Sequence, residues 1–138
     1  AWKGYQSASA EFNLSQHVRE ISYSIAEVAS ATESLLNEEA NLTGLVVLTD
    51  ASVPGALSVL KSHSKRVPED FSIVGLAVDR IAELMHPKLT AVRFPSYEMG
   101  YQAVRLLINR LRDPNHQVEQ HILSPELVIR ESSGPAPI

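Results

Sequence analysis

The chain has 138 residues, 44% of them hydrophobic, which suits one ordinary domain that buries about two thirds of its unfolded surface. Twelve basic residues against sixteen acidic ones give a net charge of -4, which argues against a nucleic-acid surface within the chain. Cysteine is absent, which excludes disulfides and thiolate metal sites and is typical of a cytoplasmic protein. The opening residues lack a signal-peptide pattern, and every apolar stretch is much shorter than the roughly 20 residues of a membrane helix, so no membrane role is expected.

The first quarter of the chain is predicted to hold two helices with a strand between them. Helical spacing places four side chains on one face of the opening segment: Trp2, Tyr5, Ala8 and Phe12. Alternating apolar residues predict a strand from 18 to 23. Ser24, followed by Glu27 three residues later, is a capping-box signal for a helix that reaches about Glu38.

The middle of the chain has the pattern of a strand, a helix and a second strand. Residues 45–48 are apolar and short enough to be a buried strand, residues 52–63 have helical spacing, and residues 72–76 are again a buried strand. Such a unit implies parallel strands joined by a right-handed crossover. We therefore predict an α/β fold built on a parallel sheet.

A long amphipathic helix is predicted near the end of the chain. Residues 90–94 form a short strand that Pro95 stops, Ser96 caps the helix, and Asp113 ends it. The apolar stripe of this helix consists of Tyr97, Tyr101, Val104, Ile108 and Leu111. Two strand-like segments follow, at 118–123 and 126–130.

Candidate ligand contacts follow from the predicted sheet, because open parallel sheets bind ligands outside the carboxyl ends of their strands. Asp50 could contact a ligand there or cap the following helix with its carboxylate. Asp79 could contact a ligand or be a solvated charge in a loop. Tyr23 could be a stacking platform or a half-buried core aromatic.

The sequence contains no motif for covalent catalysis or phosphate binding. There is no nucleophile elbow, no P-loop and no dinucleotide-binding glycine pattern. His116 and His121 would point to opposite faces of an extended segment, so neither a metal site nor a cofactor is expected. An acid/base pair of Asp50 and Asp79 remains an alternative, which would make the protein an enzyme.

Four motifs occur in order along the chain, at 67–75, 87–90, 98–100 and 127–132: Val-Pro-Glu-Asp-Phe-Ser-Ile-Val-Gly, Pro-Lys-Leu-Thr, Glu-Met-Gly and Leu-Val-Ile-Arg-Glu-Ser. In this order and at this spacing they resemble the lactose-repressor/galactose-repressor (LacI/GalR) family of bacterial transcription regulators. Gly4 and Tyr5 are similar to a glycine–aromatic pair in the helix that opens the family's second lobe.

The resemblance implies a periplasmic-binding-protein-like class I fold of two lobes, preceded in a complete regulator by a helix-turn-helix headpiece. Residues 1–138 would correspond to the C-terminal lobe, a three-layer α/β unit for effector binding and dimerisation, with the headpiece and most of the first lobe outside this chain. Residues from about 90 to 115 would normally cross to the first lobe. We therefore expect the apolar stripe of the long helix to pack on the same lobe in an altered position or on a second copy.

The resemblance also implies effector contacts, which can be compared position by position. The family's Asn-Asp at the first strand tip is Thr49-Asp50 here, and its Gly-Phe-Asp-Asp is the segment 75–78, Gly-Leu-Ala-Val, so both aspartates are absent. The residues expected to line the effector site are Tyr23, Thr49, Asp50, Ala77, Asp79 and Ser96, and those expected at a dimer interface are Pro54, Leu84 and Met85. Because Ala77 and Val78 cannot bond sugar hydroxyls, we expect an effector other than a simple free sugar.

The function implied is that of a non-enzymatic ligand sensor in a cytoplasmic, homodimeric LacI-type repressor. Its partners would be a small-molecule effector and, only through the headpiece, operator DNA. An extracytoplasmic solute-binding protein of the same fold is the nearest alternative, and an enzyme is the third.

Overall fold

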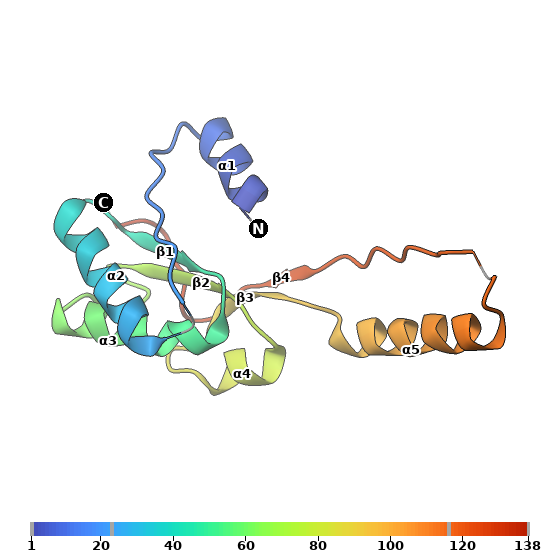
Figure 1. Ribbon diagram of the computed structural model, residues 1–138. Helices are drawn as coiled ribbons and strands as arrows, with labels where there is room; N and C mark the ends of the chain where they lie inside the picture. Colours follow the sequence, from blue (N-terminus) through green and yellow to red (C-terminus); the bar gives the residue numbers. More distant parts are fainter. Residues whose placement is uncertain (1, 23, 116, 138) are drawn as a thin grey trace.

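The computed structural model describes residues 2–22, 24–115 and 117–137. Figure 1 shows its helices and strands, which in chain order are α1 (Trp2–Glu11), α2 (Ile25–Glu38), β1 (Gly44–Val47), the 3-10 turn η1 (Asp50–Ser52), α3 (Val53–Ser62), β2 (Ser72–Leu76), α4 (Asp79–Leu84), β3 (Thr90–Arg93), α5 (Ser96–Arg112) and β4 (Glu126–Val128).

The sheet has four strands in the order β1-β2-β3-β4. β1, β2 and β3 are parallel, and β4 is antiparallel to β3. The predicted parallel unit and the α/β fold class are therefore confirmed. In the register, Gly75 lies between Val47 and Ala91, and a side chain at Gly75 would come within 2.9 Å of the Leu89 side chain.

The core lies between one face of this sheet and helices α2, α3 and α4. Leu45 and Val47 of β1 and Ile73 of β2 point to this face, because alternate residues of a strand share a face. The buried side chains of this core are Val28, Val47, Val53, Ala56, Leu60, Phe71, Ile73, Ala77, Ala82, Leu89 and Ala91.

The opposite face of the sheet is more open. Val46 of the edge strand and Leu48 just beyond it alternate with the core residues, and they remain 59% and 56% exposed. The predicted opening helix is present as α1, which stands away from the sheet (Figure 1). Trp2 stacks on Tyr5 within it, with ring centroids 5.6 Å apart.

Helix α5 projects from the end of the sheet, and the chain returns beside it to β4 (Figure 1). All of α5 is described, and none of its residues is buried. The exposed fraction reaches 86% at Tyr97 and 73% at Leu111. The expectation that this stripe packs on the same lobe is therefore wrong for this structure, whereas packing on a second copy stays a prediction.

Two predicted strands are wrong over the described residues. Residues 18–22 form no strand. The side chains of this region instead contact the end of α2, where Arg19 pairs with Glu38 and His17 lies 3.4 Å from Glu39. Residues 118–123 also form no strand, since this stretch runs beside α5 and not beside another strand (Figure 1). Within the described ranges, no helix combines the length and apolar character needed to cross a membrane.

Candidate functional site

The carboxyl ends of the three parallel strands meet at one edge of the sheet, as the sequence predicted. The register pairs Val47 with Gly75 and Gly75 with Ala91. Two residues further along, this places Thr49, Ala77 and Arg93 at the same level. The structure thus brings together the tips of β1 and β2 and adds Arg93, a cation that sequence reasoning missed.

Asp50 lies in the short turn between β1 and α3. Its Oδ1 accepts a hydrogen bond from the backbone N–H of Ala51 at 2.8 Å. The N-cap of α3 is Ser52, so the interpretation of Asp50 as the cap of that helix is wrong. Ser52 is 1% exposed, and its Oγ has no hydrogen-bond partner in the described part of the chain.

The tip of β2 presents an apolar surface. Ala77 is 4% exposed and belongs to the core. Val78 follows as the N-cap of α4 and is 44% exposed. The exposed side chain at this tip is therefore an isopropyl group and not a carboxylate.

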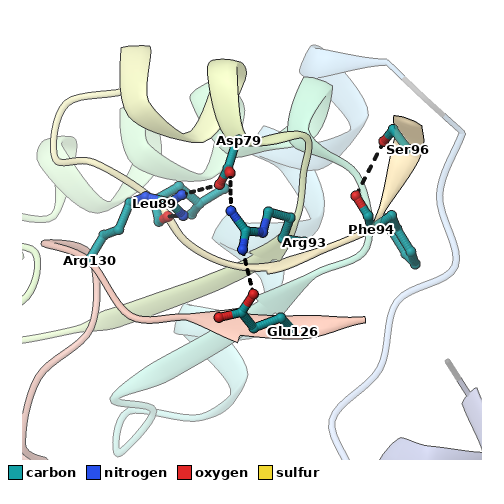
Figure 2. A network of polar contacts seen from close by, with 7 residues as sticks. All are labelled: Asp79, Leu89, Arg93, Phe94, Ser96, Glu126 and Arg130. Carbon is teal, nitrogen blue, oxygen red and sulfur yellow. Dashed lines mark hydrogen bonds and ion pairs between the residues drawn. The ribbon is translucent and has the colours of Figure 1, made fainter. Parts of the chain in front are cut away.

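Asp79 occupies the centre of a network of charged groups (Figure 2). Its Oδ2 accepts a hydrogen bond from Arg93 Nη1 at 2.6 Å, and its Oδ1 accepts one from Arg130 Nη2. Arg93 also pairs with Glu126, and Arg130 Nη1 donates to the carbonyl oxygen of Leu89 at 3.0 Å. The interpretation of Asp79 as a solvated loop charge is therefore wrong, because the residue begins α4 and is held by two arginines.

The electrostatic interactions within the network favour the ionised forms of Asp79 and Arg93. The pKa of Asp79 is lowered from its usual value of 3.8, first by the hydrogen bond from Arg93 and also by that from Arg130. The pKa of Arg93 is raised by its bonds to Asp79 and Glu126. Both carboxylate oxygens of Asp79 are thus engaged within the protein.

An open cavity of about 350 Å³ lies where the chain leaves the sheet for α5. Its lining residues are Arg93, Phe94, Pro95, Ser96, Tyr97, Glu98, Ser124 and Glu126. Ser96, a predicted contact, is therefore in its wall, and its Oγ donates to the carbonyl oxygen of Phe94 at 3.3 Å (Figure 2). From the sequence, Arg93 and Glu126 could have been suspected only as charged residues within the strands predicted at 90–94 and 126–130.

The remaining predicted residues are distributed as follows. Tyr23 lies outside the described residues. Pro54 is exposed in the first turn of α3, and Leu84, 68% exposed, ends α4. Met85 is partly buried and packs against the core. The role of Pro54, Leu84 and Met85 in a dimer stays a prediction.

Comparison with known families identifies the domain. The model of the periplasmic binding protein-like domain family matches residues 2–133. The chain belongs to this family. The resemblance to LacI/GalR regulators predicted from the four motifs is confirmed by relatives and by solved structures.

Curated relatives of this periplasmic binding protein-like chain include transcriptional regulators. The regulator RegA of Clostridium saccharobutylicum is 30% identical over 133 residues, and the repressor PurR of Aliivibrio fischeri strain MJ11 is 29% identical over 135 residues. The ribose operon repressor of Haemophilus influenzae is 29% identical over 133 residues. In each case the match covers 94% of this chain but 40% of the relative.

Solved structures of regulators share the fold over almost the whole chain. The CelR–cellobiose complex has a TM-score of 0.86 at 27% identity, covering 96% of this chain and 41% of CelR. A LacI family regulator from Enterococcus faecium with bound ribose has a TM-score of 0.84 at 27% identity, covering 99% of this chain and 51% of that protein. Neighbours of this fold thus bind small-molecule effectors.

Proposed function

We propose that this chain is the C-terminal effector-binding and dimerisation lobe of a LacI-type, DNA-binding transcriptional repressor. The observation that carries the proposal is the family match over residues 2–133, together with regulators as relatives. In this role the chain catalyses no reaction and acts in the cytoplasm. A bound effector would shift the population of two lobe arrangements, and the headpieces would bind or release operator accordingly.

The effector would bind at the carboxyl edge of the sheet. Thr49 and Asp50 at the tip of β1, Val78 at the tip of β2, and the cavity beside Arg93 and Ser96 supply its walls. Tyr23 is proposed as an additional contact on the strength of the resemblance alone. A second lobe above this edge would close the cleft, which suits a ligand held between two lobes.

The effector is proposed to be less hydroxylated than a free hexose or pentose. The tip of β2 offers Val78, and both oxygens of Asp79 are already bonded to arginines. A hydrogen bond to a charged group contributes roughly 1.5–3 kcal/mol, so the absence of two such bonds weakens sugar binding by about two to four powers of ten. A partly apolar metabolite fits this edge better.

The segment that carries α5 is proposed to complete a first lobe encoded before this one. The relatives are about two and a half times as long as the matched region, since that region is 40% of their length. Tyr97 and Leu111 are largely exposed, and a stripe of this kind is normally covered. Contact with a first lobe would bury the stripe and hold the cleft together.

A homodimer is proposed to form through the surface of α3 and α4 that carries Pro54 and Leu84. Leu84 is 68% exposed and Ile81 is 39% exposed on the same short helix. Apolar side chains grouped in this way are typical of an interaction surface. Operator DNA would be bound only by the headpiece.

The proposal is tested with the complete regulator and with this chain by itself. The complete regulator should bind one operator duplex specifically, and this chain, with its charge of -4, should not. Nanomolar, sequence-selective binding by this chain in a gel-shift assay would refute the assignment of DNA binding to a headpiece. Failure of the complete regulator to bind any duplex, together with an upstream signal peptide, would favour the solute-binding alternative.

The effector class is tested by calorimetry on the complete regulator with ribose, lactose and cellobiose, followed by less hydroxylated analogues. We expect the three sugars to bind weakly. Micromolar binding of one unmodified sugar, abolished by Thr49→Val, would show that residues at the carboxyl edge of the sheet do hydrogen-bond sugar hydroxyl groups. Asp50→Asn serves as the second variant, because its carboxylate is bonded only to the adjacent Ala51 N–H among the contacts described.

A further inference from the structure

The α5 arm, defined here as residues 94–115 and 117–125, is joined to the sheet by two connections. The outgoing connection follows Arg93 at the end of β3, and the returning one reaches Glu126 at the start of β4. Arg93 and Glu126 are direct partners in the antiparallel register, and their side chains form an ion pair. The two connections are therefore fastened to each other at the point where both leave the sheet.

Asp79 fastens this pair to the rest of the lobe. It begins α4, and its carboxylate receives Arg93 from β3 on one oxygen and Arg130, two residues beyond β4, on the other. Arg130 is the anchor, because its side chain is only 10% exposed and it also donates to the Leu89 carbonyl. Figure 2 shows the four charged side chains converging from α4, β3, β4 and the segment after β4.

This network differs from an ordinary surface ion pair. Arg66 and Asp70 form an equally well-shaped contact, with two hydrogen bonds of 2.8 and 3.0 Å, but they lie four residues apart in one turn. The Arg66–Asp70 pair can therefore stabilise only the turn in which both residues lie. Asp79 instead connects residues 14 and 51 positions away, so its removal releases one element from another.

We propose that Asp79 is a positioning residue that sets the direction of the α5 arm relative to the lobe. Because it also begins α4, any displacement of the two connections is passed to Leu84 at the other end of that short helix. The transmission of a movement from the arm to a dimer surface rests on the proposed function. The orientation of the arm by Asp79 does not depend on the proposed function, and it is measured separately.

Dipolar electron paramagnetic resonance measures that fastening directly. The chain has no cysteine, so Lys61→Cys on α3 and Arg105→Cys on α5 provide the only two attachment points for spin labels, both exposed. We expect one main distance in the parent chain. In Asp79→Asn the ratio of displaced to original arm orientations should rise about tenfold, an effect in the range usual for coupling between sites.

Three variants separate positioning from general destabilisation. Asp79→Glu retains the carboxylate and should restore much of the parent distance distribution. Asp70→Asn removes the matched surface ion pair and should leave the distribution unchanged. If Asp79→Asn matches the parent distribution, or if Asp70→Asn broadens it equally, Asp79 does not position the arm.

A further variant covers the case in which Asp79→Asn fails to fold, as judged by circular dichroism. Arg93→Gln frees the arm while leaving the Asp79–Arg130 contact in place, so the same broadening is expected. An unchanged distribution in Arg93→Gln would overturn the proposal. None of these measurements uses an effector or DNA, so their outcome is independent of whether the chain belongs to a repressor.

Discussion

Gly55 of α3 lies directly against the backbone of α2. A Cβ atom at this glycine would come within 2.6 Å of the carbonyl oxygen of Ile25, and within 3.3 Å of the Val28 side chain. A backbone carbonyl cannot move aside as the end of a flexible side chain can. The close crossing of α2 and α3 at their first turns therefore requires glycine at this position.

We predict that Gly55→Ala destabilises the lobe despite its better helix propensity. Alanine gains up to about 1 kcal/mol over glycine in a helix, whereas overpacking costs about 1–3 kcal/mol, so the net free energy of unfolding should fall. Urea denaturation followed by circular dichroism measures the change. Gly100→Ala in α5 is the control, because nothing lies within 4 Å of its Cβ position, and it should stabilise the helix.

Ser132, the last residue of the motif at 127–132, forms two hydrogen bonds through its buried hydroxyl group. Its side chain is 1% exposed, its Oγ donates to the carbonyl oxygen of Ile73 at 2.6 Å, and it accepts from the N–H of Thr90 at 2.8 Å. It thereby joins the final segment to β2 and β3. We predict that Ser132→Ala lowers the free energy of unfolding by about 2–3 kcal/mol, because two buried backbone groups lose a partner.

The exposed Ser15 supplies the control for this serine. Ser15→Ala should change the free energy of unfolding by less than about 0.5 kcal/mol, as is usual on the surface. Equal stability of the two variants in urea would show that water or backbone movement replaces the Ser132 bonds.

The sequence predicted those parts of the fold that depend on local patterns. The periodicity of α2, α3 and α5 and the apolar run of β2 were found within a few residues, because each pattern lies inside one segment. The strand expected at 18–23 needed a hydrogen-bonded partner strand, and residues 18–22 take no part in the strand pairing of the sheet. Helix α4 was missed because six residues make less than two turns.

The candidate site was predicted only in outline. Thr49, Asp50 and Ala77 lie at the strand tips as predicted, because strand tips follow from strand positions. Their contact with an effector stays a prediction. The pairing of Asp79 with Arg93 and Arg130 was not, because it depends on the register of three segments spread over 51 residues. A pattern in sequence shows which residues are charged, but not which of them meet.

Acid should weaken the lobe in part through Asp79. Its pKa in the folded state is lowered from 3.8, chiefly by Arg93, so the unfolded chain binds a proton more readily than the folded one. The stabilisation is therefore present above that value and is lost as pH falls through the lower, folded pKa. Urea midpoints measured from about pH 6 downward should decline less steeply in Asp79→Asn than in the parent. Parallel curves would contradict a contribution from this carboxylate.

The exposed stripe of α5 gives the last prediction. With Tyr101, Val104 and Ile108 between 41% and 56% exposed, the arm offers apolar side chains that a second copy of the chain can cover. Burial of one such side chain contributes about 1.5–3 kcal/mol, or roughly one to two powers of ten in a dissociation constant. We expect concentration-dependent association in sedimentation velocity, weakened by Val104→Glu with Ile108→Glu. Leu84→Glu is the matched variant on α4. If only this variant abolishes association, the chain dimerises through the α3 and α4 surface. A parent chain that is monomeric at all concentrations would contradict both interfaces.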